Sequence, residues 1–150
     1  MLQHLKEFFT EHAGRDSEAD LDERLRVACA ALMVEMERAD ARTDADEQHT
    51  VARLLAEHFS LTREQTARLL ELADERADDA TSLYEFTSLI HANFSMDEKR
   101  ELLAMLWRTA YADGRLNKYE EALVRKVAEL LYMPHQDFIA IKLKVQSETS

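Results

Sequence analysis

Apolar residues recur every three or four positions along most of the chain, and charged residues fill the intervals. Between about Glu18 and Ala39, for example, Leu21, Leu25 and Leu32 fall on one face. This spacing is typical of a helix that buries one side and exposes the other. It predicts eight helices, at about 2–13, 18–39 and 44–59, and starting near residues 62, 82, 95, 117 and 134.

Several of these helices begin at a recognisable start signal. A capping box places a Ser, Thr or Asn before the helix and a Glu or Gln three residues later, so that each side chain satisfies a backbone N–H. Pro134 suits a first helical turn, and Gly14 ends the first helix. The four predicted boxes are Thr62 with Gln65, Ser82 with Glu85, Ser95 with Glu98, and Asn117 with Glu120.

The composition agrees with a fold made of helices alone. Two glycines and one proline in 150 residues leave too few turn residues for a β-protein. The length is that of one ordinary domain. We therefore predict a single all-α domain, a compact bundle of seven to eight helices, with an N-terminal helix within residues 1–16 and a frayed polar tail at 146–150.

The chain carries a formal net charge of -11, from 30 acidic and 19 basic residues. Such a surface repels nucleic acid and anionic lipid and attracts cations or a basic protein face. No stretch has the roughly 18 apolar residues of a membrane span, and no signal peptide is recognisable. The single cysteine, Cys29, falls among apolar helix positions and fits a reducing compartment. We expect a cytoplasmic protein with a protein partner.

A weak internal repeat brings acidic residues to two equivalent bends. The segment "ADARTDADEQHTVARLL" (39–55) aligns with "ADGRLNKYEEALVRKVA" (112–128), and after one indel "EHFSLT" (57–62) aligns with "ELLYMP" (129–134). A long helix, an acidic bend, a helix, a turn and another helix therefore occur twice. Gly114 has become Ala41 in the first copy. The repeat aligns Asp40 with Asp113, Asp44 with Asn117, and Glu47 with Glu120.

Helix capping explains part of the second bend. Gly114 suits the left-handed position after a helix, and Asn117 with Glu120 can cap the helix that follows. Asp113, however, falls at the negative end of a helix dipole, which costs about 0.3–1 kcal/mol. Asp40 has the same position in the first copy. The compensating partner can be the N–H groups of the next helix, Arg42 or Arg115, or a bound cation.

The cation interpretation has a partial motif behind it. Residues from Asp113 to Glu120 fit the later positions of an EF-hand loop, but Thr109 and Tyr111 stand where its first carboxylates belong. An ordinary EF-hand is therefore excluded. A looser site remains, and its oxygen ligands would suit calcium, magnesium or manganese. The candidate ligands are Asp113, Asn117 and Glu120, or, in the first copy, Asp40, Asp44, Asp46 and Glu47.

The stretch "WRTAYADGRLNKYEEALVRKVAELL", preceded by "SLIHANFSMDEKRELLAML", resembles the tellurite-resistance TerB-like family. The resemblance covers roughly residues 20–145 and implies an all-helical fold of two pseudo-repeats. The hallmark of the family falls on Ala112, Asp113, Gly114 and Glu120, with Asp40 and Glu47 as partners in the first copy. The departure at Ala41 puts an equivalent first site in doubt. Members resemble calcium-responsive stress proteins, and related domains are appended to co-chaperones.

The rest of the sequence favours a protein that is not an enzyme. Two glycines cannot supply a Walker, Rossmann or nucleophile-elbow pattern, and the scattered histidines form no metal motif. His91 lacks a sequence neighbour that assigns it a task, and Trp107 with Tyr111 has the spacing of a core pair. We predict a non-enzymatic stress-response module that binds a divalent cation at its acidic bends. The alternative is a metal-free protein-interaction domain of co-chaperone or adaptor type, with an acidic face.

Overall fold

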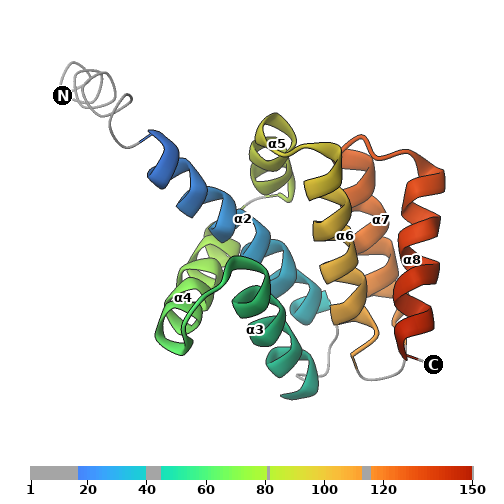
Figure 1. The fold of residues 1–150 in the computed structure, drawn as a ribbon, viewed down its shortest axis with the longest axis horizontal. Coiled ribbons are helices and arrows are strands. Elements are labelled where there is room, and N and C mark those ends of the chain that lie inside the picture. The colour runs from blue at the N-terminus through green and yellow to red at the C-terminus, as the bar shows by residue number, and fades with distance from the viewer. Residues whose placement is uncertain (1–16, 40–44, 81, 113–115, 150) are drawn as a thin grey trace.

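The protein is described here from a computed structural model, which places residues 17–39, 45–80, 82–112 and 116–149. Every regular element within these residues is an α-helix, as predicted (Figure 1). The predicted helix at 2–13 and the acidic residues Asp40, Asp44 and Asp113 lie outside them. The helices are α2 (Ser17–Ala39), α3 (Ala45–Phe59), α4 (Arg63–Asp79), α5 (Tyr84–Asn93), α6 (Met96–Ala110), α7 (Lys118–Leu130) and α8 (His135–Thr149).

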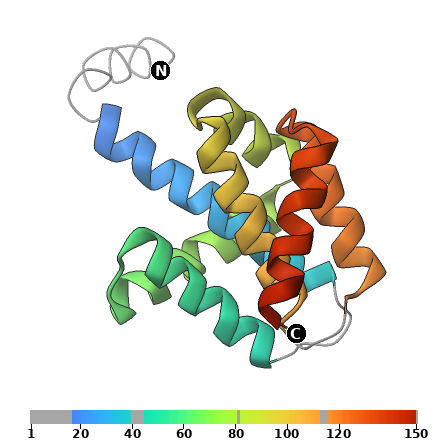
Figure 2. The same ribbon diagram turned by 45° about the vertical axis from the view of Figure 1, so that its right-hand side comes forward.

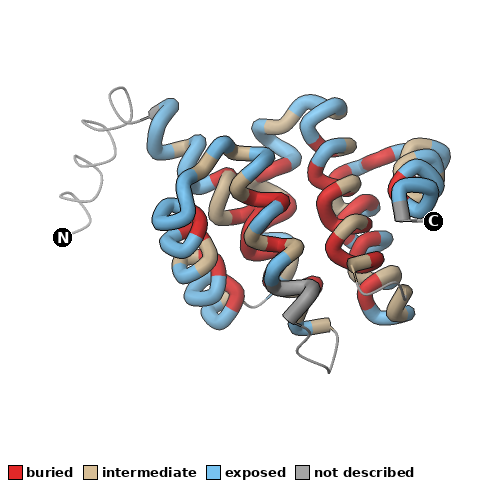
Figure 3. Tube along the Cα trace, turned by 60° about the horizontal axis from the view of Figure 1, so that its bottom comes forward, coloured by how far each residue is buried: buried red, intermediate tan, exposed pale blue. Residues whose placement is uncertain are grey.

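Helix α2 is the centre of the packing. It contacts α3, α4, α5, α6 and α7 (Figures 1 and 2), and residues 28–34 in its middle are all buried. A helix that is apolar all round must be surrounded by other elements. Its N-terminal half extends beyond the neighbouring helices and is largely exposed, whereas α6 and α7 bury their inward faces (Figure 3).

The two halves of the chain make equivalent contacts. Helix α2 packs on α3 and α4, as α6 packs on α7 and α8. Between the halves the contacts are reciprocal, because α3 touches α6 and α7 touches α2. Val51 and Val124, which the repeat aligns, are both fully buried. This arrangement agrees with a unit that is used twice.

The turns that follow α3 and α7 also share one geometry. Ser60 and Tyr132 have φ values of 55° and 58°, in the left-handed region that is uncommon for residues other than glycine. In each turn a later N–H reaches back across the helix end, from Leu61 to the Ala56 carbonyl at 2.9 Å and from Met133 to the Ala128 carbonyl at 3.0 Å. These are Schellman-type endings, and they fall at positions that the sequence alignment pairs.

The structure confirms two of the predicted capping boxes and corrects a third. Thr62 with Gln65 starts α4, and Ser95 with Glu98 starts α6. Helix α5 instead starts after Leu83, which has helical dihedral angles and makes no side-chain cap. Its carbonyl accepts the N–H groups of the next turn directly, so this helix begins without the cap expected from Ser82.

The C-terminal segment forms the end of α8. Residues 146–149, expected to be frayed, continue α8 as far as Thr149. Arg108 of α6 holds Glu148 with two hydrogen bonds, at 3.0 and 3.1 Å, and such bidentate pairs fix both partners. In the described part of the chain, no helix has the length and apolar character needed to cross a membrane.

Candidate functional site

The bend between α6 and α7 is described on both sides of residues 113–115. Helix α6 ends at Ala110, and the N–H of Tyr111 still donates to the Trp107 carbonyl at 2.9 Å. Trp107 is fully buried and Tyr111 nearly so, which confirms the predicted core pair. On the far side Asn117 precedes α7 as its N-cap. The end of one helix and the start of the next are thus both fixed by local hydrogen bonds.

Asn117 is an N-cap, as predicted, but it bonds a different residue. Its Oδ1 accepts the N–H of Tyr119, two residues later, at 2.7 Å, whereas the sequence predicted a bond from the third residue. One lone pair of this oxygen is therefore engaged in starting α7. The amide oxygen has a second lone pair, so capping does not prevent it from binding a cation.

Glu120 lies in the first turn of α7 and is completely buried, at 0% exposure. The matching residue of α6, Glu98, is exposed, and its Oε1 accepts the Ser95 N–H at 2.9 Å. The first turn of α7 does not form this reciprocal box, so the predicted capping role of Glu120 is wrong. A carboxylate in the interior is costly unless charge or hydrogen bonds compensate, and the positive end of the α7 dipole supplies part of that.

Of the candidate cation ligands predicted from the sequence, only two have side chains that the structure describes. These are Asn117, the N-cap of α7, and Glu120, in the first turn of that helix. Glu47 belongs to the first turn of α3, but its side chain is outside the description, as are Asp113, Asp40 and Asp44. Among the residues whose side chains are placed, no group of three or more His, Cys, Asp or Glu is arranged to hold a metal ion.

A buried lysine lies at the opposite end of α7. Lys99 of α6 is only 5% exposed. Its Nζ donates to the Leu131 carbonyl at 3.1 Å and lies 2.7 Å from His91 Nδ1. Burial lowers the pKa of this lysine. No sequence pattern predicted the burial of Lys99, because this residue falls in the charged run "DEKRE" and its partners are brought together only by the fold.

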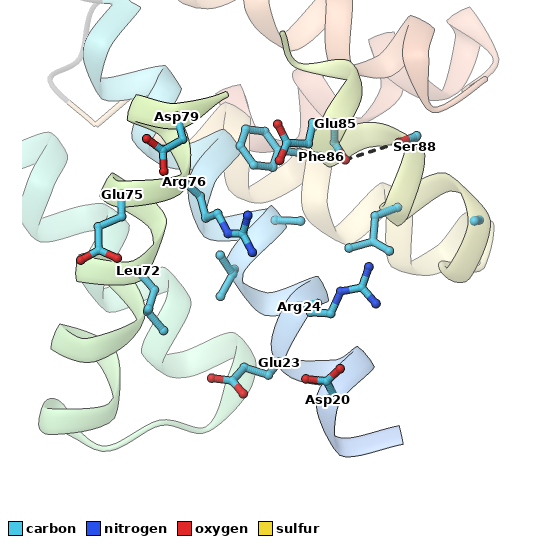
Figure 4. A pocket seen from close by; sticks show the side chains of 14 residues that line it. Asp20, Glu23, Arg24, Leu72, Glu75, Arg76, Asp79, Glu85, Phe86 and Ser88 are labelled. Carbon is cyan, nitrogen blue, oxygen red and sulfur yellow. Dashed lines mark hydrogen bonds between the residues drawn. The ribbon is translucent and has the colours of Figure 1, made fainter. Parts of the chain in front are cut away.

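A groove of about 820 Å³ lies between α2, α4 and α5 (Figure 4). Its walls carry both charged and apolar side chains. No sequence motif predicted this groove, because its lining residues come from three separate helices that meet only in the fold. Cys29, by contrast, is buried as predicted, and burial raises the pKa of its thiol to about 12, so the thiol stays protonated.

The fold and the site define a helical module with an acidic bend before a helix that buries a glutamate. The chain matches the family model described as "Tellurite resistance protein TerB" over residues 26–143. Because this match covers well over half of its length, the chain belongs to the TerB family. Neither the curated proteins nor the solved structures include a match.

Proposed function

We propose that this TerB-family protein is a non-enzymatic stress-response module that binds a divalent cation at the bend between α6 and α7. The observation that supports it is the complete burial of Glu120 in the first turn after the bend. A glutamate that only capped the helix would lie at the surface, as Glu98 does. A buried carboxylate attracts a cation more strongly than an exposed one, since the local dielectric constant is lower.

The available donors fit a hard cation. Glu120 and Asp113 supply carboxylate oxygens and Asn117 an amide oxygen, which suit calcium, magnesium or manganese. The first bend, with Asp40, Asp44 and Glu47, is a second and weaker candidate because Ala41 replaces the glycine there. Such a site would link cation concentration to the stability of the α6–α7 junction, since a ligand that binds only the folded state stabilises it.

We propose that the module works by binding rather than by catalysis, in the cytoplasm. A nucleophile needs a base within hydrogen-bond reach. In the described part of the chain Lys99 lies within such reach of His91, but its Nζ also donates to the Leu131 carbonyl. The lone thiol of Cys29 is buried. The net charge of -11 argues against nucleic acid as a partner.

Thermal melting with and without metal tests the cation proposal. Wild type, Asp113→Asn and Glu120→Gln are melted with chelator and with calcium or manganese, beside Glu98→Gln as the matched control. A cation at 100 times its Kd adds about 2.7 kcal/mol to the free energy of unfolding. We expect this gain in wild type and in the control, and its loss in the two bend variants. A wild type that melts identically in chelator and in both metals would refute the proposal.

A metal-free protein-interaction domain of co-chaperone or adaptor type is the second candidate function. The observation in its favour is the groove between α2, α4 and α5, whose charged walls face solvent (Figure 4). Calorimetric titration of the demetallated protein separates the two candidates. Heat on adding calcium or manganese supports the cation site, and its absence leaves the interaction function.

A further inference from the structure

We propose that the groove between α2, α4 and α5 is a docking site for a basic, amphipathic α-helix of a partner protein. The proposal does not depend on a cation at the α6–α7 bend. It rests on the second candidate function, protein interaction, and gives that function a surface and a class of partner. Three observations carry it: the apolar floor of the groove, its excess of carboxylates, and the lack of ion pairs among the charges that line it.

The floor of the groove is apolar, and its length matches that of a short α-helix. Val27, Leu72, Phe86 and Leu89, contributed by three different helices, line it together with small alanines. The lining residues run over positions 20–28 of α2 and 72–79 of α4, which correspond to about 12 and 10 Å at 1.5 Å per residue. This is the length of two turns of helix. A helix that inserts its apolar face into such a groove is a recurrent mode of recognition.

Carboxylates outnumber guanidinium groups on the walls by five to two. Figure 4 shows Arg24 and Arg76 extending into the space between the helices, with the acidic groups placed around them. An occupant should therefore place its apolar face along the middle and its cationic side chains at the rim. The charged lining residues are Asp20, Glu23, Glu75, Asp79 and Glu85, with Arg24 and Arg76.

None of these seven side chains takes part in an ion pair within the described part of the chain, whereas their neighbours do. On α4, Asp74 and Asp78 pair with Arg38 at 3.6 and 2.9 Å. Glu75 and Asp79, each one position further on, face the groove instead. Asp74 and Asp78 are thus neutralised by Arg38 of the same protein, whereas Glu75 and Asp79 are left for a partner of opposite charge.

A designed peptide tests the docking site directly. The probe is a 14-residue helix with leucine at every third or fourth position and lysine elsewhere, and its control carries glutamate in place of each lysine. Both are labelled and titrated with the full-length protein in chelator, so that a cation at the bend plays no part. We expect the basic peptide to bind and the acidic peptide not to bind. Equal binding of both peptides, or none of either, would overturn the proposal.

Variants of the protein locate the bound peptide. Glu23→Lys reverses one charge of the groove, and Glu129→Lys makes the same change on the exposed surface of α7, outside it. We expect the first to weaken binding by about fivefold or more and the second to have little effect. Ala92→Trp, at an exposed position of the groove wall, should also block the peptide by filling its space. If Glu23→Lys and Glu129→Lys weaken peptide binding equally, the peptide is attracted by the net charge of the protein and not by the groove, and the proposal is overturned.

Two further variants test other occupants. Arg76→Gln removes a cation from the groove, so binding of the basic peptide should be unchanged or tighter. Weaker binding would mean that the groove selects an anion, against the proposal. Phe8→Asp combined with Phe9→Asp alters the N-terminal segment and should leave the affinity unchanged. Binding that becomes ten times tighter would show that this segment is the natural occupant. A dimer in sedimentation that Glu23→Lys dissociates would assign the groove to a second copy of the chain, which equally overturns the proposal.

Discussion

Each end of α7 has a buried ionisable side chain, acidic at the start of the helix and basic at its end. At its start Glu120, from α7 itself, lies in the first turn and is fully buried. At its end Lys99, from α6, donates to the Leu131 carbonyl. Each sign suits its place, because the helix dipole is positive at the N-terminus and negative at the C-terminus. The helix thus compensates in part the cost of burying both groups.

The two ends differ in what surrounds them. Lys99 has two defined partners, His91 Nδ1 and the Leu131 carbonyl, and both come from neighbouring helix ends. Through these two contacts Lys99 of α6 joins the ends of α5 and α7, and we call the group of Lys99, His91 and Leu131 the clasp. Glu120 instead lies directly after the acidic bend, where the family hallmark falls. The comparison gives the lysine a structural role, through contacts with two other helix ends, and places the glutamate beside the bend of the proposed cation site.

Replacing Glu120 should have the largest effect on stability. Glu120→Ala removes a fully buried side chain and opens a cavity, so we expect the free energy of unfolding to fall by about 3 kcal/mol. Glu98→Ala removes an exposed capping group at the same position of α6 and should cost about 1 kcal/mol or less. Urea denaturation of both variants in chelator measures the difference. Equal losses would mean that the burial of Glu120 contributes no more to stability than the exposed Glu98 does, which would contradict the contrast between the two helix starts.

Features set by neighbouring residues were predictable from the sequence, and those set by distant ones were not. The capping boxes at Thr62 and Ser95 depend on residues three apart, and they were predicted correctly. Ser82 fits the same pattern, but the chain at Leu83 already turns as a helix. The capping pattern predicted that Glu120 would cap α7 at the surface, but the side chain is buried instead. Burial depends on tertiary packing, which a local pattern does not contain.

The clasp and the groove are features of the structure that no local sequence pattern could predict. Lys99 and Leu131 are 32 positions apart, and the lysine belongs to a polar run that indicates an exposed face. The groove combines residues from α2, α4 and α5, none of which forms a motif alone. The acidic bend, by contrast, could be proposed as a candidate site from the sequence, since both copies of the repeat place acidic residues between two predicted helices.

Lys99→Met tests the clasp at the other end of α7. The variant keeps most of the side-chain volume but leaves the Leu131 carbonyl and His91 without their donor, so we expect a loss of about 1–2 kcal/mol. Burial lowers the pKa of Lys99 in the folded protein. Between this lowered pKa and the unfolded value of about 10.4, the unfolded chain binds more protons, and the free energy of unfolding rises with pH.

This alkaline gain belongs to wild type and not to Lys99→Met, so the difference between them should widen as the pH approaches 10. Urea denaturation at a series of pH values, with both proteins side by side, measures it. The subtraction removes the contributions of the other titrating groups. A difference that stays constant would show that Lys99 has the same pKa in both states, and one that narrows toward high pH would show a raised pKa in the folded protein. Either result would contradict an electrostatic cost of burying Lys99.

The smallest effects on stability are expected from replacing the N-cap residues. Comparing two such variants with and without metal distinguishes the capping role of Asn117 from its proposed role as a cation ligand. Ser95→Ala removes the acceptor of the Glu98 N–H, and Asn117→Ala removes that of the Tyr119 N–H. Each should cost about 1 kcal/mol in chelator. With calcium or manganese the two should diverge, because only Asn117 is a proposed ligand. Ser95→Ala should keep the metal-induced gain in melting temperature, and Asn117→Ala should lose part of it. Asn117→Asp retains the cap and adds a carboxylate, so its gain should equal or exceed that of wild type. If Asn117→Ala keeps the full gain, the amide is a cap alone, and any cation at the bend must be held without it.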